Sequence, residues 1–128
     1  MKIPKPCTAY YYGGLPVKGQ RRKGRLCIEQ DQFFFDVPEH RGSEGIHLKV
    51  SPQDMDRIFL SRDNYYGSDT VLFNLTFRDK NGKSFTLRFA PIAIIPRRRI
   101  ALQKEWLDFL TEAIQLKAAP LSEAGRNS

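Results

Sequence analysis

The residues with the clearest chemical potential in this chain are cations clustered near its N-terminus. Residues 18–25 carry five positive charges and no negative one. Lysine and arginine side chains make charge-assisted hydrogen bonds to phosphate, and several of them on one flexible loop act together. The sequence therefore predicts an anion-binding loop formed by Lys18, Arg21, Arg22, Lys23 and Arg25.

A second basic cluster, Arg97, Arg98 and Arg99, lies just before a predicted C-terminal helix. The two clusters together carry a charge of +8 and the other residues sum to −1, so the basicity is local. Cations at the N-terminus of a helix are opposed by the helix macrodipole, which suggests a role outside the helix; salt bridges to neighbouring acids are the equal alternative. We expect this cluster at the end of the domain opposite the first loop, where one flat membrane does not reach both.

The other reactive side chains do not form a recognisable catalytic or metal site. Cys7 and Cys27 have no metal-ligand spacing and no histidine near them in the sequence, and a domain of this size does not need a disulfide. The histidines and glutamates of residues 39–47 match no known ligand spacing. No glycine-rich phosphate loop follows a strand, and no nucleophile elbow is present. We expect a protein without enzymatic activity, cofactor or metal.

The elements that must position the cations are mostly strands. Alternating apolar and polar residues are typical of half-buried strands, and the clearest case is the pair 71–78 and 85–89. Asn81-Gly82 between them supplies the positive φ of a hairpin turn. Similar short segments bring the number of predicted strands to seven, at residues 8–12, 25–30, 33–37, 46–50, 57–61, 71–78 and 85–89.

After the strands the apolar spacing changes to three and four residues, which predicts an amphipathic helix over residues 100–117 that ends before Pro120. The predicted fold is mainly β: seven antiparallel strands with one C-terminal helix covering the open end of the sheet. We expect residues 1–7 and 118–128 to be flexible and residues 8–117 to form the domain. Trp106 should be buried near Phe73, Leu75 or Phe85.

This order of elements resembles the pleckstrin-homology-like superfamily, in which two sheets of four and three strands are capped by a C-terminal helix. A tryptophan recurs in that helix, and Trp106 occupies the matching place in the segment 105–110. Residues 12–16 (YGGLP) and 24–28 (GRLCI) resemble a bacterial or lipid-associated branch of the superfamily. The resemblance covers roughly residues 8–117 and rests on the pattern of elements.

The resemblance also implies a class of ligand. In lipid-binding members the loop between the first two strands carries a lysine, then a basic residue, any residue and an arginine, and Lys18, Lys23, Gly24 and Arg25 follow that order. The implied partner is an anionic lipid headgroup or a membrane surface. Bacterial members often bind protein segments instead, so a protein or peptide partner is the alternative.

Nucleic acid is a third and less favoured partner. The sequence pI near 9.6 permits it, and Tyr10, Tyr11, Tyr12, Tyr65 and Tyr66 could stack on bases, but no recognition helix or RNA-binding signature is present. No apolar run approaches the roughly 20 residues that cross a bilayer, and residues 1–7 do not form a secretory signal. We expect a cytoplasmic protein, peripheral to a membrane if its ligand is lipid.

Overall fold

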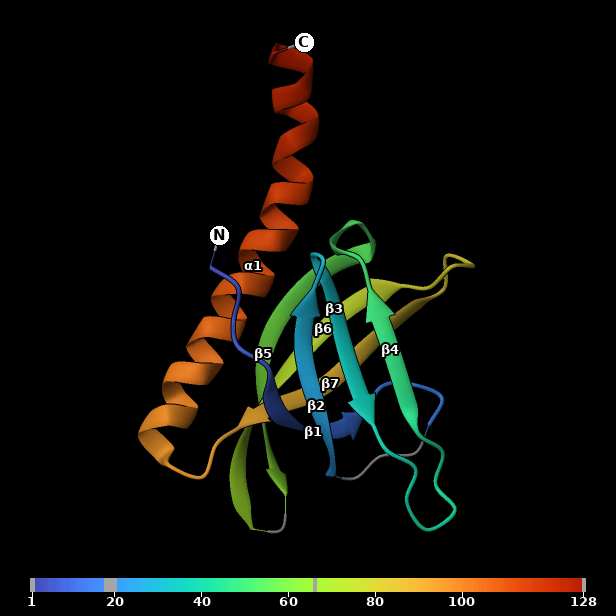
Figure 1. The fold of residues 1–128 in the computed structure, drawn as a ribbon, viewed down its shortest axis with the longest axis vertical. Helices are drawn as coiled ribbons and strands as arrows, with labels where there is room; N and C mark the ends of the chain where they lie inside the picture. The colour runs from blue at the N-terminus through green and yellow to red at the C-terminus, as the bar shows by residue number, and fades with distance from the viewer. Residues whose placement is uncertain (1, 18–20, 66, 128) are drawn as a thin grey trace.

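A computed structural model describes residues 2–17, 21–65 and 67–127 of the chain. Within these residues the protein is mainly β, with seven antiparallel strands and one C-terminal helix, as the alternation of apolar residues predicts (Figure 1). The elements are β1 (Cys7–Gly13), β2 (Arg22–Glu29), β3 (Gln32–Val37), β4 (Ile46–Val50), a 3₁₀ helix (Pro52–Asp54), β5 (Met55–Tyr65), β6 (Ser68–Arg78), β7 (Ser84–Ile92) and α1 (Pro96–Asn127).

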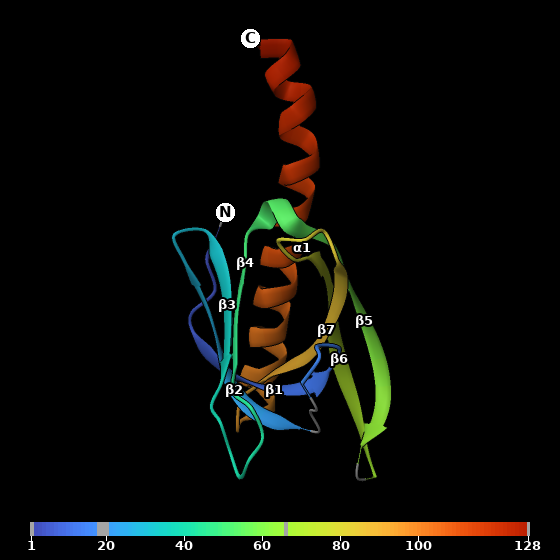
Figure 2. The same cartoon turned by 90° about the vertical axis from the view of Figure 1, so that its right-hand side faces the viewer.

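The strands form one continuous sheet in the order β4-β3-β2-β1-β7-β6-β5. The resemblance implies sheets of four and three strands; here β1 pairs with both β2 and β7 and so joins the two halves into one sheet. The register of β1 against β7 shifts between Tyr11 and Gly13, and such a bulge bends a sheet. Figure 2 shows the consequence: β2–β4 and β5–β7 lie on opposite sides, with α1 between them.

The inner faces of the bent sheet and one side of α1 form the main core. Its largest side chains are aromatic, and Phe33 of β3 and Phe73 of β6 both pack against Phe89 of β7. Trp106 of α1 is fully buried, which confirms its predicted place in the core. The Trp106 ring contacts the Phe33 ring at a centroid distance of 6.2 Å. The predicted neighbours Phe73 and Leu75 belong to the same core cluster.

A second, smaller cluster of buried side chains lies on the other side of the sheet. It contains Tyr12, Leu72 and Ala90, with Tyr10 packed against it. Strand β6 is therefore buried in part on both faces. Asn74 is also buried, and its Nδ2 donates to the Ser61 Oγ at 2.9 Å and to the Phe59 carbonyl oxygen at 3.3 Å. This outer cluster forms the base of the site described below.

Two segments outside the predicted strands are partly strand. β2 begins at Arg22, so Arg22 and Lys23 belong to the ladder with β1 rather than to the loop. β5 and β6 extend into residues 64–69, where Asn64 pairs with Asp69 and an Arg62–Asp69 ion pair of 2.8 Å ties the two strands. Local composition indicates a turn there, but long-range pairing extends the strands. Tyr66 lies outside the described residues.

The helix is longer than its apolar stripe predicts. It begins at Pro96, since proline suits the first turn of a helix, and continues past Pro120 to Asn127. The predicted end at Pro120 is therefore wrong. A proline inside a helix costs about 3 kcal/mol, which weakens the helix but does not forbid it. Figures 1 and 2 show the C-terminal part of α1 extending beyond the sheet.

Candidate anion-binding site

The predicted basic loop is divided between the two faces of β2. Successive residues of a strand point to opposite faces, so Arg22 shares its face with the buried Gly24 and Leu26, while Lys23 and Arg25 are exposed on the other. The Arg22 Nη2 donates to the Pro38 carbonyl oxygen at 3.0 Å, and its buried Nη1 has no hydrogen-bond partner among the described residues. Lys18 lies outside the described residues. Among the described residues, the predicted basic side chains are therefore divided between two faces of β2 rather than gathered on one loop.

Lys23 and Arg25 line a shallow concavity of about 460 Å³ on the outer face of β1–β4. Asp36 lies directly opposite Arg25 in the ladder and accepts a contact of 3.1 Å from the Nδ1 of His47. A carboxylate therefore shares the concavity with these two cations. This part of the surface attracts an anion less strongly than its cations alone suggest.

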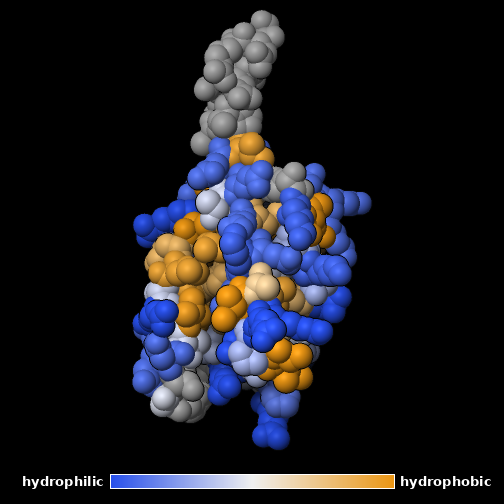
Figure 3. Space-filling model, turned by 90° about the vertical axis from the view of Figure 1, so that its left-hand side faces the viewer, coloured by the Kyte–Doolittle hydropathy of each residue, from blue (hydrophilic) through white to orange (hydrophobic). Residues whose placement is uncertain are grey.

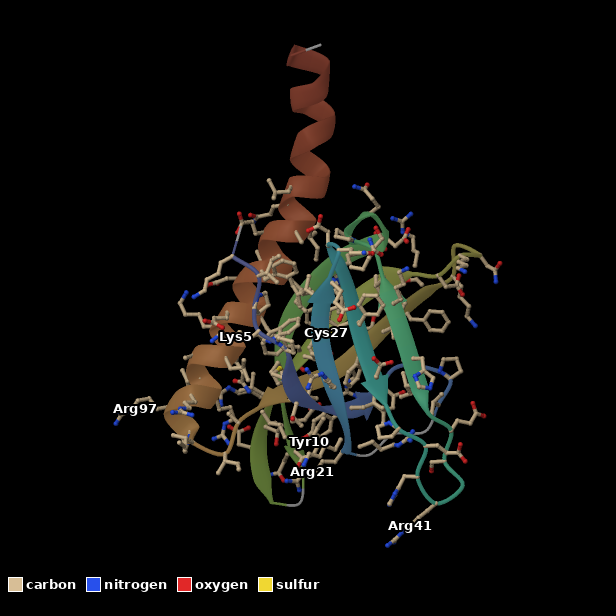
Figure 4. All side chains as sticks on the ribbon, viewed as in Figure 1. Lys5, Tyr10, Arg21, Cys27, Arg41 and Arg97 are labelled. Atoms are coloured by element: carbon tan, nitrogen blue, oxygen red, sulfur yellow. The ribbon has the colours of Figure 1, made fainter. Side chains whose placement is uncertain are left out.

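A second concavity, of about 430 Å³, brings together one arginine from each basic cluster. It is lined by Arg21, which precedes β2, and by Arg99 of α1, above the outer cluster of the sheet. We call it the Arg21–Arg99 concavity; its lining is Tyr10, Tyr12, Arg21, Asp69, Thr70, Val71, Ala90, Ile92, Arg99, Ile100 and Gln103. Our expectation that the clusters lie at opposite ends of the domain is wrong, and Figure 4 shows Arg21 and Arg97 in the same lower part of the molecule.

The short length of β1 explains why the clusters meet. The β1–β2 loop follows one end of β1, and the end of β7 pairs with Thr8 near the other end. Tyr10 lies between them, and each residue of a strand spans only about 3.3 Å. The Arg21 guanidinium reaches back over the Tyr10 ring, 5.1 Å from its centroid, while α1 turns back along the sheet and carries Arg99 to the same place.

The charges of the Arg21–Arg99 concavity are mainly positive. Its carboxylate, Asp69, is already paired with Arg62 at 2.8 Å, so it offsets little of the charge of the two arginines. The first turn of α1 contains no acidic residue, and none of Arg97, Arg98 and Arg99 forms an ion pair with a described residue. The predicted alternative of salt bridges for this cluster thus finds no support in the described part of the chain. The macrodipole of α1 adds further positive potential.

Polar groups at the walls of the concavity could orient a ligand. The Gln103 Nε2 donates to the Pro91 carbonyl oxygen at 2.9 Å, which fixes the side chain and holds α1 against β7. Tyr10 and Tyr12 meet edge to face at 6.4 Å and form an aromatic wall. In the sequence, these tyrosines were singled out only because their rings could stack on nucleic-acid bases. Gln103 and Thr70 had no recognisable signal, because their place beside the arginines depends on how α1 and β6 lie against β1.

The two cysteines are unsuited to nucleophilic chemistry. Both are free thiols, as expected. Burial raises the pKa of the Cys7 thiol to about 12, against a smaller opposite effect of the neighbouring Trp106 indole. Burial, followed by the charges of Glu29 and Asp36, also raises the pKa of Cys27. A nucleophilic cysteine needs a lowered pKa, so neither thiol is activated.

A labelling experiment tests the state of Cys7. In the native protein at neutral pH, iodoacetamide should alkylate Cys7 far more slowly than it alkylates the same residue in urea, as followed by mass spectrometry. The raised pKa also makes the folded state lose stability as the pH rises from about 9 towards about 12, since only the unfolded chain ionises Cys7 readily there. Rapid native labelling of Cys7 would contradict its placement beside Trp106.

Three further findings concern metal binding, membrane spanning and similarity to known proteins. Among the described residues no group of histidine, cysteine or carboxylate side chains is arranged to hold a metal ion. A search of the same residues finds no helix with the length and apolar character needed to span a bilayer. No family model, curated protein or solved structure matches this chain.

Proposed function

We propose that this chain is a non-enzymatic binding domain of the pleckstrin-homology-like type whose ligand is anionic, a lipid headgroup or a membrane surface. The observation that carries the proposal is the convergence of Arg21 and Arg99 on one concavity. The seven-stranded antiparallel sheet, the C-terminal helix and the buried Trp106 are what this class of domain would require. A peripheral, cytoplasmic location follows from the proposal.

The chemistry of the concavity suits a phosphate group. Guanidinium groups remain charged at every physiological pH and match the oxygens of a phosphate in pairs. Two of them approach from different elements, so one anion can be held from two sides. The apolar base formed by Val71 and Ala90 and the aromatic wall formed by Tyr10 suit the uncharged part of such a ligand.

A vesicle-binding assay tests this function. The double variant Arg21→Ala/Arg99→Ala should bind vesicles of phosphatidylcholine and phosphatidylserine about 30-fold more weakly than the unchanged protein, since each cation near an anionic bilayer contributes about 1 kcal/mol. The melting temperature should stay nearly constant, because exposed charges add little to stability. Sedimentation with anionic and with neutral vesicles measures the difference.

The matched control is Lys49→Ala/Lys80→Ala, which removes the same charge from exposed positions outside the concavity. It should weaken binding much less. A third variant, Lys23→Ala/Arg25→Ala, should fall between the two, because Asp36 partly offsets these cations. Equal losses in all three would indicate diffuse electrostatics, as in non-specific binding to nucleic acid, and would reject the concavity as the site.

A second candidate function is recognition of a protein segment at the edge of the sheet. β5 is the last strand in the sheet order, and its exposed Phe59 and Leu60 could pack against an added strand. Such binding depends on backbone hydrogen bonds and apolar contact, so it should survive high salt. Binding through Arg21 and Arg99 should not, because salt screens exposed charges.

A further inference from the structure

The connection from β7 to α1 exposes large apolar side chains at a protruding turn. Ile94 is 99% exposed, Ile95 is 49% exposed and Ile100 is 68% exposed. Every residue from 94 to 101 is exposed, and burial of the helix begins only at Leu102. Isoleucine is normally among the most buried residue types, so this grouping in a short segment indicates a contact surface.

The same segment carries the second basic cluster. Arg97, Arg98 and Arg99 lie between Ile95 and Ile100, and no acid lies in the first turn of α1. This combination costs free energy in the isolated domain for two reasons. Water surrounds the isoleucine side chains, and the helix macrodipole opposes the cations. An apolar phase with a negatively charged boundary would relieve both. An anionic bilayer has these two properties at a single surface.

We propose that the β7–α1 turn, residues 94–100, inserts into the interface of an anionic bilayer. Ile94 and Ile95 enter the boundary of the acyl chains, and Arg97–Arg99 contact lipid phosphates above them, as in other interfacial segments that combine apolar and basic residues. Arg99 and Ile100 also line the Arg21–Arg99 concavity, so the inserted turn and the anion site are continuous. The inference rests on the proposed function and selects a membrane as the source of the anion.

The position of the turn supports insertion. Figure 1 shows the β7–α1 connection at the lower left of the molecule, and Figure 4 shows the Arg97 side chain pointing outward there, away from the sheet. Figure 3, which faces the side that carries α1, shows apolar side chains beside strongly hydrophilic ones near this lower end. A protein partner would need a matching acidic and apolar groove, whereas a bilayer supplies charge and apolar depth to any protruding turn.

The first test removes the apolar side chains and keeps the charge. Ile94→Ser/Ile95→Ser should bind vesicles of equimolar phosphatidylcholine and phosphatidylserine about 10-fold more weakly or worse, because burial of an isoleucine side chain favours binding by roughly that factor. The control is Ile3→Ser, which changes an isoleucine that is 52% exposed. Its neighbours Lys2 and Pro4 lie beside the middle of α1, far along the helix from the β7–α1 turn. The control should bind as the unchanged protein does.

The second test reads depth directly and does not depend on the serine variant folding. Trp106 is the sole tryptophan in the sequence and is fully buried, so it gives a constant background. Tryptophan placed by Ile94→Trp should shift its emission to the blue on anionic vesicles and be quenched by lipids brominated in the acyl chain. Asn81→Trp, in the turn at the other end of β7, should show neither effect. Absence of quenching at position 94 would overturn the insertion.

A soluble probe separates this inference from the proposed function. Inositol hexakisphosphate should bind Ile94→Ser/Ile95→Ser as tightly as it binds the unchanged protein, because the arginines are intact. Unchanged vesicle binding by the serine variant, together with binding of the soluble anion, would overturn the insertion and leave the anion site standing. If the unchanged protein binds neither vesicles nor inositol hexakisphosphate, both proposals are overturned.

Discussion

Trp106→Ala is expected to lower the free energy of unfolding by about 3 to 5 kcal/mol, the usual cost of replacing a large buried aromatic residue by alanine. The indole is fully buried where α1 meets the sheet, and it packs edge to face on Phe33. Alanine would leave a cavity lined by both halves of the sheet. Urea unfolding followed by circular dichroism measures the loss, and far-UV spectra establish whether α1 is still helical.

The control for this prediction is Trp106→Phe. The buried Nε1 of Trp106 has no nitrogen or oxygen partner among the described residues, so phenylalanine removes volume without breaking a strong hydrogen bond. Its cost should be clearly smaller than that of alanine. If alanine and phenylalanine were equally mild, the docking of α1 would contribute little to the stability of the sheet, which would contradict the core described here.

Gly14→Ala is expected to destabilise the protein by about 3 kcal/mol or more, from the combined costs of overpacking and of backbone strain. Gly14 has a φ of +98°, a backbone angle that residues with a side chain rarely adopt. A Cβ atom there would overlap the Thr86 carbonyl oxygen and lie 2.8 Å from the Thr86 carbonyl carbon. These atoms belong to the backbone of β7, so relief requires movement of the strand. Thermal and urea unfolding measure the effect.

Gly82→Ala separates the two causes. Gly82 has a similar φ of +80°, but nothing lies within 4 Å of a Cβ atom built on it. Its substitution should cost only the penalty of the left-handed backbone, about 1 to 2 kcal/mol. A Gly14 variant no less stable than the Gly82 variant would show that β7 adjusts freely, and would weaken the case for a rigid junction between the β1–β2 loop and β7.

The strands and the helix were predictable because their signals are local. Alternation in residues 71–78 and 85–89, with Asn81-Gly82 between them, identifies the hairpin without knowledge of the rest of the chain. The spacing of Trp106, Phe109 and Leu110 likewise identifies the buried side of α1. The ends of elements were less predictable, since pairing with a neighbouring strand extended β5 and β6 into residues with the composition of a turn.

The amino-acid pattern alone predicts the seven strands, the helix and the burial of Trp106, although not every end of these elements. The sequence did not predict that Lys23 and Arg25 share a face of β2, because Lys23 was expected in the loop before that strand. Three relations became visible only in the folded chain: Arg21 and Arg99 line one concavity, Arg22 turns towards Pro38, and Asp36 lies beside Arg25. Such relations depend on strand register and on the docking of α1, which join segments far apart in the chain and are set by the packing of the whole core.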